Sequence, residues 1–191
     1  VKAAHVALQN ARIRAEDLDL IVVATATPDR TLPSTAVIVQ GKLGNNKGLA
    51  FDVAGVCAGF LLALNVVDNF LKSGQGKYAL VIGAEAMTSL LDMGDRRTCV
   101  LFGDGAGAVV LRQDVVPGII GADLHADGRS RHLPFVMGRH AASGVGAGAA
   151  FTQRRQRAAP AGGIVASAAE SAAAARAAAA MRVRDLHALA M

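Results

Sequence analysis

One cysteine stands at a position where proteins commonly build a nucleophile. Cys57 lies between a strand expected at residues 49–54 and a helix expected at residues 58–73, with Gly55 and Gly59 close beside it. Small neighbours permit a sharp turn and let a substrate approach closely, as in the serine elbow of hydrolases. At a helix N-terminus, unpaired backbone N–H groups and the positive end of the helix dipole favour the thiolate. The pattern predicts a nucleophilic thiol, and the alternative is a buried cysteine that packs as a small apolar residue.

Strand and helix patterns alternate around this cysteine over the first 128 residues. Continuous apolar runs indicate strands buried on both faces, and apolar residues three or four apart indicate helices. The expected helices are residues 1–11, 34–44 and 58–73, and the expected strands are residues 18–26, 49–54, 77–85 and 118–128. Residues 98–112 indicate two more strands around a tight glycine turn, which would place Cys99 in a core strand. The alternation predicts an α/β fold with a mainly parallel sheet, helices on both faces and one antiparallel hairpin.

Two of the expected helices carry further signals. Ser34 is a good cap for the helix at residues 34–44, and Gly44 stands where that helix would end. The helix at residues 58–73 is apolar around most of its circumference until its last turn. A helix of that kind is expected to be buried between two layers rather than to lie on the surface.

Composition and cysteine count exclude several classes of protein. Hydrophobic residues make up 52% of the 191 residues and charged residues 18%, which argues against a chain that is disordered throughout. Two cysteines without metal-ligand spacing make neither a disulfide framework nor a metal site, so we expect a cytoplasmic protein without a metal. The longest apolar run, residues 53–64, is far shorter than the roughly 20 residues that a membrane helix needs.

The basic character of the chain belongs to its last third. The net charge is +5, but residues 1–128 carry 11 Lys and Arg against 13 Asp and Glu, whereas residues 129–191 carry 9 against 2. Residues 141–191 contain 21 alanines, and such low-complexity sequence offers few large apolar side chains for a core. We therefore expect an α/β domain at residues 1–128 and an unrelated Ala/Arg-rich tail at residues 129–191, either disordered or translated from a shifted reading frame. The domain opens on helical periodicity without an initiator Met, so we expect it to be incomplete at its start.

Four ordered segments of residues 1–128 resemble one enzyme family. They read LDLIVVATATPDRTLPSTA, FDVAGVCAGFLLAL, KYALVIGAEAMTSLLDMGDRRTCVLFGDGAGAVVL and GADLHADG. In these segments the chain resembles the β-ketoacyl-acyl carrier protein synthase III family, the thiolase-like condensing enzymes that start fatty-acid chains. The resemblance implies the layered αβαβα fold of thiolases, of which residues 1–128 would be a first-half fragment.

The resemblance also implies roles for three residues. Cys57 matches the acyl-accepting nucleophile of the family. Leu32 matches the side chain that crosses the dimer interface and closes the acyl pocket of the partner, although it could equally pack within its own subunit. Arg96 matches a position that contacts the adenine of coenzyme A, the alternative being a solvated pair with Arg97. His125 lies outside the family's Cys-His-Asn triad and is given no catalytic role.

The glycine-rich stretch at residues 103–108 could be taken for a nucleotide-binding motif. It reads GDGAGA and follows an apolar run without opening a helix, so it fails the context test of a dinucleotide-binding motif. We expect it to form a turn that lets the backbone pack near the active site.

Two family motifs are absent from these 191 residues. The catalytic His and Asn of the family lie in motifs built around PHQAN and GNTSA, and neither motif occurs here. We expect acyl transfer from acyl-CoA to Cys57, followed in a complete enzyme by decarboxylative condensation with malonyl-acyl carrier protein. No cofactor is expected beyond the acyl-CoA substrate, and the expected assembly is a homodimer that binds neither nucleic acid nor membrane. The alternative is a noncatalytic relic or dimerising module, with nucleic-acid binding through the basic tail a distant third.

Overall fold

The computed structural model describes residues 1–91, 93–94, 96, 99–116 and 118–126. Residues 1–118 belong to one compact unit, and residue 119 begins a second, of which residues 119–126 are described. The tail expected at residues 129–191 lies outside the described residues, so the fold below is that of the first unit. In the part of the chain that is described, no helix is long and apolar enough to cross a membrane.

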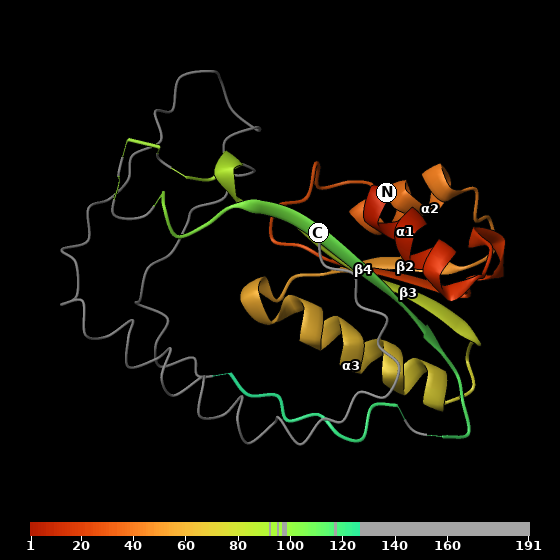
Figure 1. Ribbon diagram of the computed structural model, residues 1–191. Helices are drawn as coiled ribbons and strands as arrows, with labels where there is room; N and C mark the ends of the chain where they lie inside the picture. Colours follow the sequence, from red (N-terminus) through yellow and green to blue (C-terminus); the bar gives the residue numbers. More distant parts are fainter. Residues whose placement is uncertain (92, 95, 97–98, 117, 127–191) are drawn as a thin grey trace. The chain divides into compact units, whose positions relative to one another are not determined.

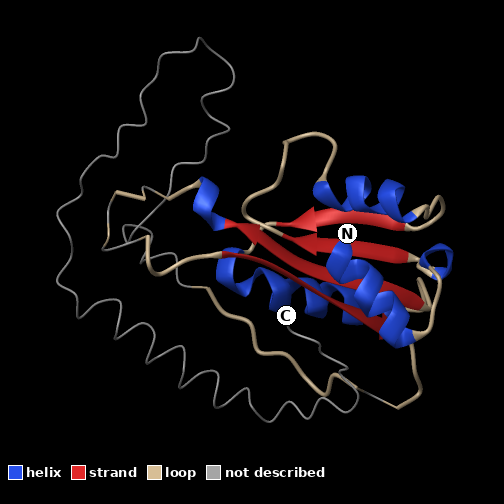
Figure 2. Ribbon diagram, turned by 45° about the horizontal axis from the view of Figure 1, so that its top comes forward, coloured by secondary structure: helices blue, strands red, loops and turns tan. Residues whose placement is uncertain are grey.

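A four-stranded sheet forms the centre of this unit (Figure 2). Its strands are β1 (Leu20–Ala24), β2 (Leu49–Val53), β3 (Tyr78–Ala86) and β4 (Asp104–Arg112), in the order β2-β1-β3-β4. β1 pairs in parallel with both β2 and β3, and β4 runs antiparallel to β3. All five residues of β1 are buried, as its continuous apolar sequence predicts for a strand covered on both faces.

Helices cover both faces of the sheet (Figure 1). α1 (Lys2–Ala11) and α2 (Thr35–Leu43) lie on one face, and α3 (Gly59–Lys72) lies on the other. Successive residues of β1 point to opposite faces. Ile21 and Val23 join the core under α1 and α2, whereas the core under α3 receives the other three residues of the strand. The predicted α/β layering with helices on both faces is confirmed.

The two helix-end signals of α2 are confirmed. The Ser34 hydroxyl accepts a hydrogen bond from the Val37 amide at 3.4 Å, and Gly44 ends the helix with a left-handed φ of 75°. Gly44 is suited to that position because a side chain there would be strained by the positive φ.

The predicted strands at residues 98–112 and 118–128 need correction. Among the described residues 99–112 only one strand forms, β4, and its hairpin partner is β3. Gly105 and Gly107 lie inside β4 and pair with Glu85 and Gly83, so the GDGAGA stretch is mostly extended strand and not a turn. Glycine permits a turn but does not impose one, and pairing along the whole length of β3 satisfies more backbone groups. Residues 118–126 form no strand in the described part of the chain.

The expectation for α3 also needs correction. Its buried residues, Gly59, Ala63, Leu64, Val67 and Leu71, form one stripe against the sheet. On other sides Leu61 is 52% exposed and Val66 40% exposed. In the described residues, α3 is therefore covered on one side only, although its apolar circumference predicted burial between two layers.

Asn45 connects α2 to the start of the sheet. Its side chain is 2% exposed, and its Nδ2 donates to the carbonyls of Ala15 and Leu18, both at 2.8 Å. Its Oδ1 accepts from the Gly48 amide at 2.9 Å and from Gln40 Nε2 at 3.2 Å. A buried amide with this many partners fixes the turn that leads from α2 into β2.

Replacing Asn45 with Ala should lower the free energy of unfolding by about 2–3 kcal/mol, because it leaves buried carbonyl and amide groups without partners. Urea unfolding followed by circular dichroism measures this loss. The matched control is Asn46→Ala, at the exposed neighbouring position, which should change stability by less than about 0.5 kcal/mol. Equal losses in the two variants would contradict the role given to Asn45.

Candidate active site

Cys57 lies in a one-turn 3₁₀ helix, Val56–Ala58, that joins β2 to α3. Cys57 is exposed, so a substrate can reach its thiol. The turn is tight because of Gly55, where a Cβ atom would lie 2.5 Å from Leu62 Cδ1 and 2.8 Å from the Gly59 Cα. The strand-to-helix turn predicted around Cys57 is therefore present, and Cys57 is not buried as a small apolar residue among the described residues. Its role as a nucleophile stays a prediction.

The backbone beside the thiol is strained. Val56 has a φ of 48°, which a β-branched residue adopts only when its surroundings impose it. Strain of this kind is concentrated at functional sites, and the strand-turn-helix nucleophile elbow is one example. Because Val56 directly precedes Cys57, its backbone conformation helps to set the direction of the Cys57 side chain.

The start of α3 has no side-chain cap. The helix is 14 residues long, its N-cap is Ala58, and no side chain caps its first turn. The first turn also holds no acidic residue. The Gly59 amide already donates to the Val56 carbonyl, and the helix dipole favours negative charge at this end, which is the charge of an oxyanion formed there.

Leu32 lies in the loop between β1 and α2 and is 81% exposed. The alternative that Leu32 packs within its own subunit is therefore wrong for the described residues. Its place across a dimer interface stays a prediction, because the structure contains one chain.

Two carboxylates that the sequence analysis missed fix this loop at its ends. The Glu85 carboxylate accepts hydrogen bonds from the Ala26 amide at 2.9 Å and from the Thr27 hydroxyl at 2.7 Å. The Asp52 carboxylate accepts from the amides of Thr35 and Ala36, at 2.8 and 2.7 Å. Both acids interrupt apolar strand sequence, and that interruption is the signal that could have identified them.

Arg96 lies between the 3₁₀ turn Met87–Ser89 and β4 and is exposed. No hydrogen bond or ion pair joins it to another residue of the described ranges. Nearby, the Thr88 hydroxyl and amide donate to Asp104 at 2.6 and 2.8 Å and hold the pKa of that carboxyl below its ordinary value. Contact of Arg96 with coenzyme A stays a prediction.

The remaining candidates lie outside the elbow. Cys99 is half-buried in a turn and not in a strand, so its expected place in a core strand is wrong. His125 is exposed, and its Nε2 lies 2.5 Å from Asp123 Oδ1. No cluster of His, Cys, Asp and Glu among the described residues has the arrangement of a metal site.

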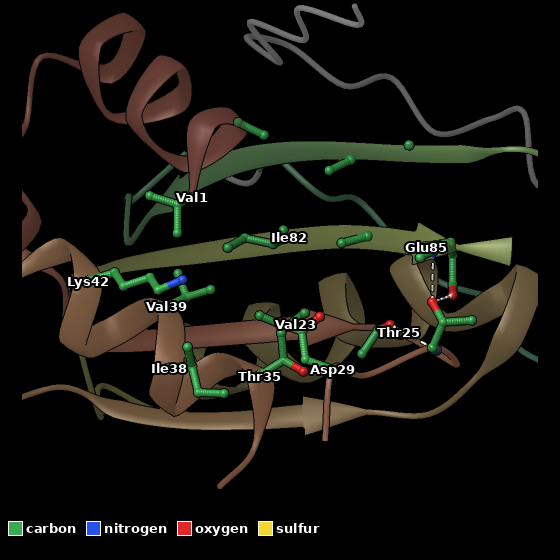
Figure 3. Close-up of a pocket in the computed structure, with 16 residues that line it drawn as sticks. Val1, Val23, Thr25, Asp29, Thr35, Ile38, Val39, Lys42, Ile82 and Glu85 are labelled. Atoms are coloured by element: carbon green, nitrogen blue, oxygen red, sulfur yellow. Dashed lines mark hydrogen bonds between the residues drawn. The ribbon is translucent and has the colours of Figure 1, made fainter. Parts of the chain in front are cut away.

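A cavity of about 410 Å³ lies on the face of the sheet that carries α1 and α2 (Figure 3). Thr25, Glu85, Thr35 and Lys42 are among its lining residues, and the Thr35 hydroxyl is buried without a partner among the described residues. Cys57 does not line this cavity. The cavity is therefore separate from the elbow and is not assigned to the acyl group.

Sequence comparisons find similarity to one enzyme family. Residues 51–128 match the family described as 3-oxoacyl-[acyl-carrier-protein (ACP)] synthase III. The β-ketoacyl-[acyl-carrier-protein] synthase III of Ehrlichia canis is 54% identical over 145 residues, which cover 75% of this chain and 46% of that protein. The enzyme of the same name from Rhodospirillum centenum is 55% identical over 141 residues, covering 71% of this chain and 44% of that protein. Over the matched residues, this chain is similar to the ketoacyl synthase III family.

Solved structures agree with this similarity. The 3-oxoacyl-[acyl-carrier-protein] synthase III of Aquifex aeolicus is 50% identical, with a TM-score of 0.58 over 59% of this chain and 37% of that chain. The priming β-ketosynthase of the R1128 polyketide pathway is 38% identical, with a TM-score of 0.60 over 61% and 35% of the two chains. The predicted thiolase-like fold, present as a first-half fragment, is confirmed.

The chain spans about half the length of the curated relatives that it matches. The aligned shares of 75% and 71% amount to more than 128 of its residues, so the similarity to this ketoacyl synthase III family reaches past residue 128. The division of the chain into an enzyme-like domain at residues 1–128 and an unrelated tail at residues 129–191 stays a prediction.

Replacing Val56 with Asn should raise the free energy of unfolding by about 1 kcal/mol. Asn adopts a left-handed backbone with less strain than Val, and Val56 is 62% exposed, so little packing is lost. Urea unfolding measures the gain. The control is Val66→Asn, at a similarly exposed position inside α3 where the backbone is helical, and it should give no gain. A Val56→Asn variant no more stable than Val66→Asn would show that the elbow stores no strain.

Proposed function

We propose that the chain carries the acyl-accepting half-reaction of a β-ketoacyl-acyl carrier protein synthase III, with Cys57 as the catalytic nucleophile. The observation that carries the proposal is an exposed cysteine at a strained strand-to-helix turn, inside the residues that match the family. The substrate class is an acyl-coenzyme A thioester.

The chemistry of this step needs a thiolate and donors for an oxyanion. The Cys57 sulfur adds to the thioester carbonyl, and the carbonyl oxygen becomes negative in the tetrahedral intermediate. Collapse of the intermediate expels the thiolate of coenzyme A and leaves an acyl group on Cys57. The uncapped first turn of α3 supports this step, because its N–H groups favour negative charge close to the thiol.

In a complete enzyme, the acyl group would then condense with malonyl-acyl carrier protein. Loss of carbon dioxide from the malonyl thioester gives an enolate that attacks the acyl carbonyl and releases the Cys57 thiolate. The enolate oxygen needs strong donors, which the family supplies from its PHQAN and GNTSA motifs. Neither motif occurs in these 191 residues, so the proposal for these residues is limited to formation of the acyl-enzyme.

Other parts of the proposal follow from single residues. The exposed Leu32 supports a homodimer in which this side chain reaches the acyl pocket of the partner. The exposed Arg96 is available for coenzyme A, since guanidinium groups stack on planar rings and pair with phosphates. No resident cofactor is proposed. Two unpaired cysteines suit a reducing, cytoplasmic location, where a catalytic thiol stays active.

The second candidate is a noncatalytic dimerising module. Exposed apolar side chains on α3, Leu61 and Val66, support it, because they offer a surface for another protein segment. The missing His and Asn motifs support it as well. Acyl transfer to Cys57 separates the two candidates, since a noncatalytic module would not carry it out.

Incubation of the purified chain with acetyl-coenzyme A should add one acetyl group to the protein, measured by intact-mass spectrometry, because the thiol is exposed. The Cys57→Ala variant should lose the adduct completely. Cys99→Ala is the matched control and should keep the adduct, since Cys99 lies outside the elbow. No adduct on a folded wild-type sample, or an adduct that survives Cys57→Ala, would overturn the proposed function.

A further inference from the structure

The loop between β1 and α2 forms an exposed arm, residues 29–33. Every residue of the arm is exposed, including the apolar Leu32 at 81%. The cavity of about 410 Å³ lies at the base of the arm, with Asp29 and Thr35 in its lining (Figure 3). Packing therefore contributes little to the direction of the arm, and hydrogen bonds at its two ends must supply it.

The first end of the arm is bonded to β3. Glu85 is half-buried near the end of that strand, and its two oxygens accept from the Ala26 amide and the Thr27 hydroxyl. The Thr27 hydroxyl oxygen in turn accepts from the Ala86 amide at 2.8 Å. Glu85 and Thr27 together form a closed set of bonds between the residues after β1 and the end of β3. Hydrogen bonds to a carboxylate are stronger than those between neutral groups, which suits an anchor for an exposed loop.

The second end of the arm is bonded to β2. The Asp52 carboxylate accepts from the Thr35 and Ala36 amides, directly after the arm, while Ser34 caps the same helix start. Asp52 lies on the strand that leads into the turn of Cys57. One strand thus fixes both the end of the arm and the start of the nucleophile turn.

We propose that Glu85, with Thr27, and Asp52 are positioning residues that fix the direction of the arm, and with it the direction of Leu32, the side chain that the proposed function places at the acyl pocket of a second copy of the chain. The inference rests on the proposed function, because it needs an acyl pocket. It deepens that function by naming residues that act on acyl-chain selectivity through Leu32. The test uses the Thr27 end, because Asp52 also stabilises α2 and its loss would affect folding.

The first measurement is independent of activity. Thr27→Val keeps the shape of the side chain but removes the hydroxyl that joins Glu85 to the Ala86 amide. We expect hydrogen exchange of the backbone amides at residues 26–33 to accelerate about fivefold, the change that loss of one net hydrogen bond gives. The control is Thr31→Val, the same change within the arm. Thr31 has no hydrogen bond to another described residue, so this variant should leave exchange unchanged. Equal exchange in Thr27→Val and wild type would overturn the anchor.

The second measurement is acyl-chain selectivity. The ratio of the rates at which Cys57 is acylated by hexanoyl-coenzyme A and by acetyl-coenzyme A should rise about fivefold in Thr27→Val, because a loosened arm closes the pocket less well. Leu32→Ala should raise the ratio too. The double variant should equal Leu32→Ala alone, since Thr27 is proposed to act through Leu32. Thr27→Ser, which retains the hydroxyl, should restore the wild-type ratio.

The outcomes separate the two proposals. Additive effects in the double variant, or an unchanged ratio in Thr27→Val, would overturn the positioning role while acyl transfer itself stands. Absence of any acylation in the folded wild-type chain would overturn the proposed function, and with it the selectivity role. The exchange measurement would still decide whether Glu85 and Thr27 anchor the arm.

Discussion

Parallel pairing of β1 with both of its neighbours is the constraint on which the rest of this structure depends. Because the three strands run the same way, β1 and β2 end at the same edge of the sheet, and β3 ends there too. The arm leaves β1 at this edge and the nucleophile turn leaves β2 there. Open α/β sheets commonly bind ligands beyond the carboxyl ends of their strands, and the same edge carries the proposed nucleophile, Cys57.

Polar bonds then lock the connections at this edge. Glu85 joins the residues after β1 to the end of β3, and Asp52 joins the start of α2 to β2. Each acid is half-buried, with two backbone amides bonded to Asp52 and an amide and the Thr27 hydroxyl bonded to Glu85, so it stabilises loops that have little apolar packing of their own. The apolar core under the helices supplies the rigid support against which these bonds act.

The helix α3 has exposed apolar side chains in a chain that matches only part of its relatives' length. Leu61 and Val66 face away from the sheet, and the chain corresponds to less than half the length of its curated relatives. A helix that is apolar around its circumference gains full burial only between two layers. The described residues supply one of these layers. The helix α3 is therefore less buried than its apolar sequence predicts.

The sequence by itself determined the helices, the three parallel strands and the place of Cys57, because each rests on local signals: apolar runs, the Ser34 cap, Gly44 and the small residues around the thiol. It misjudged residues 98–112, since glycine permits a turn and a strand alike, and only the pairing offered by β3 decides between them. It also missed Asp52 and Glu85. Their partners lie 16 and 59 residues away in the chain, so only the tertiary structure brings those amides to the carboxylates.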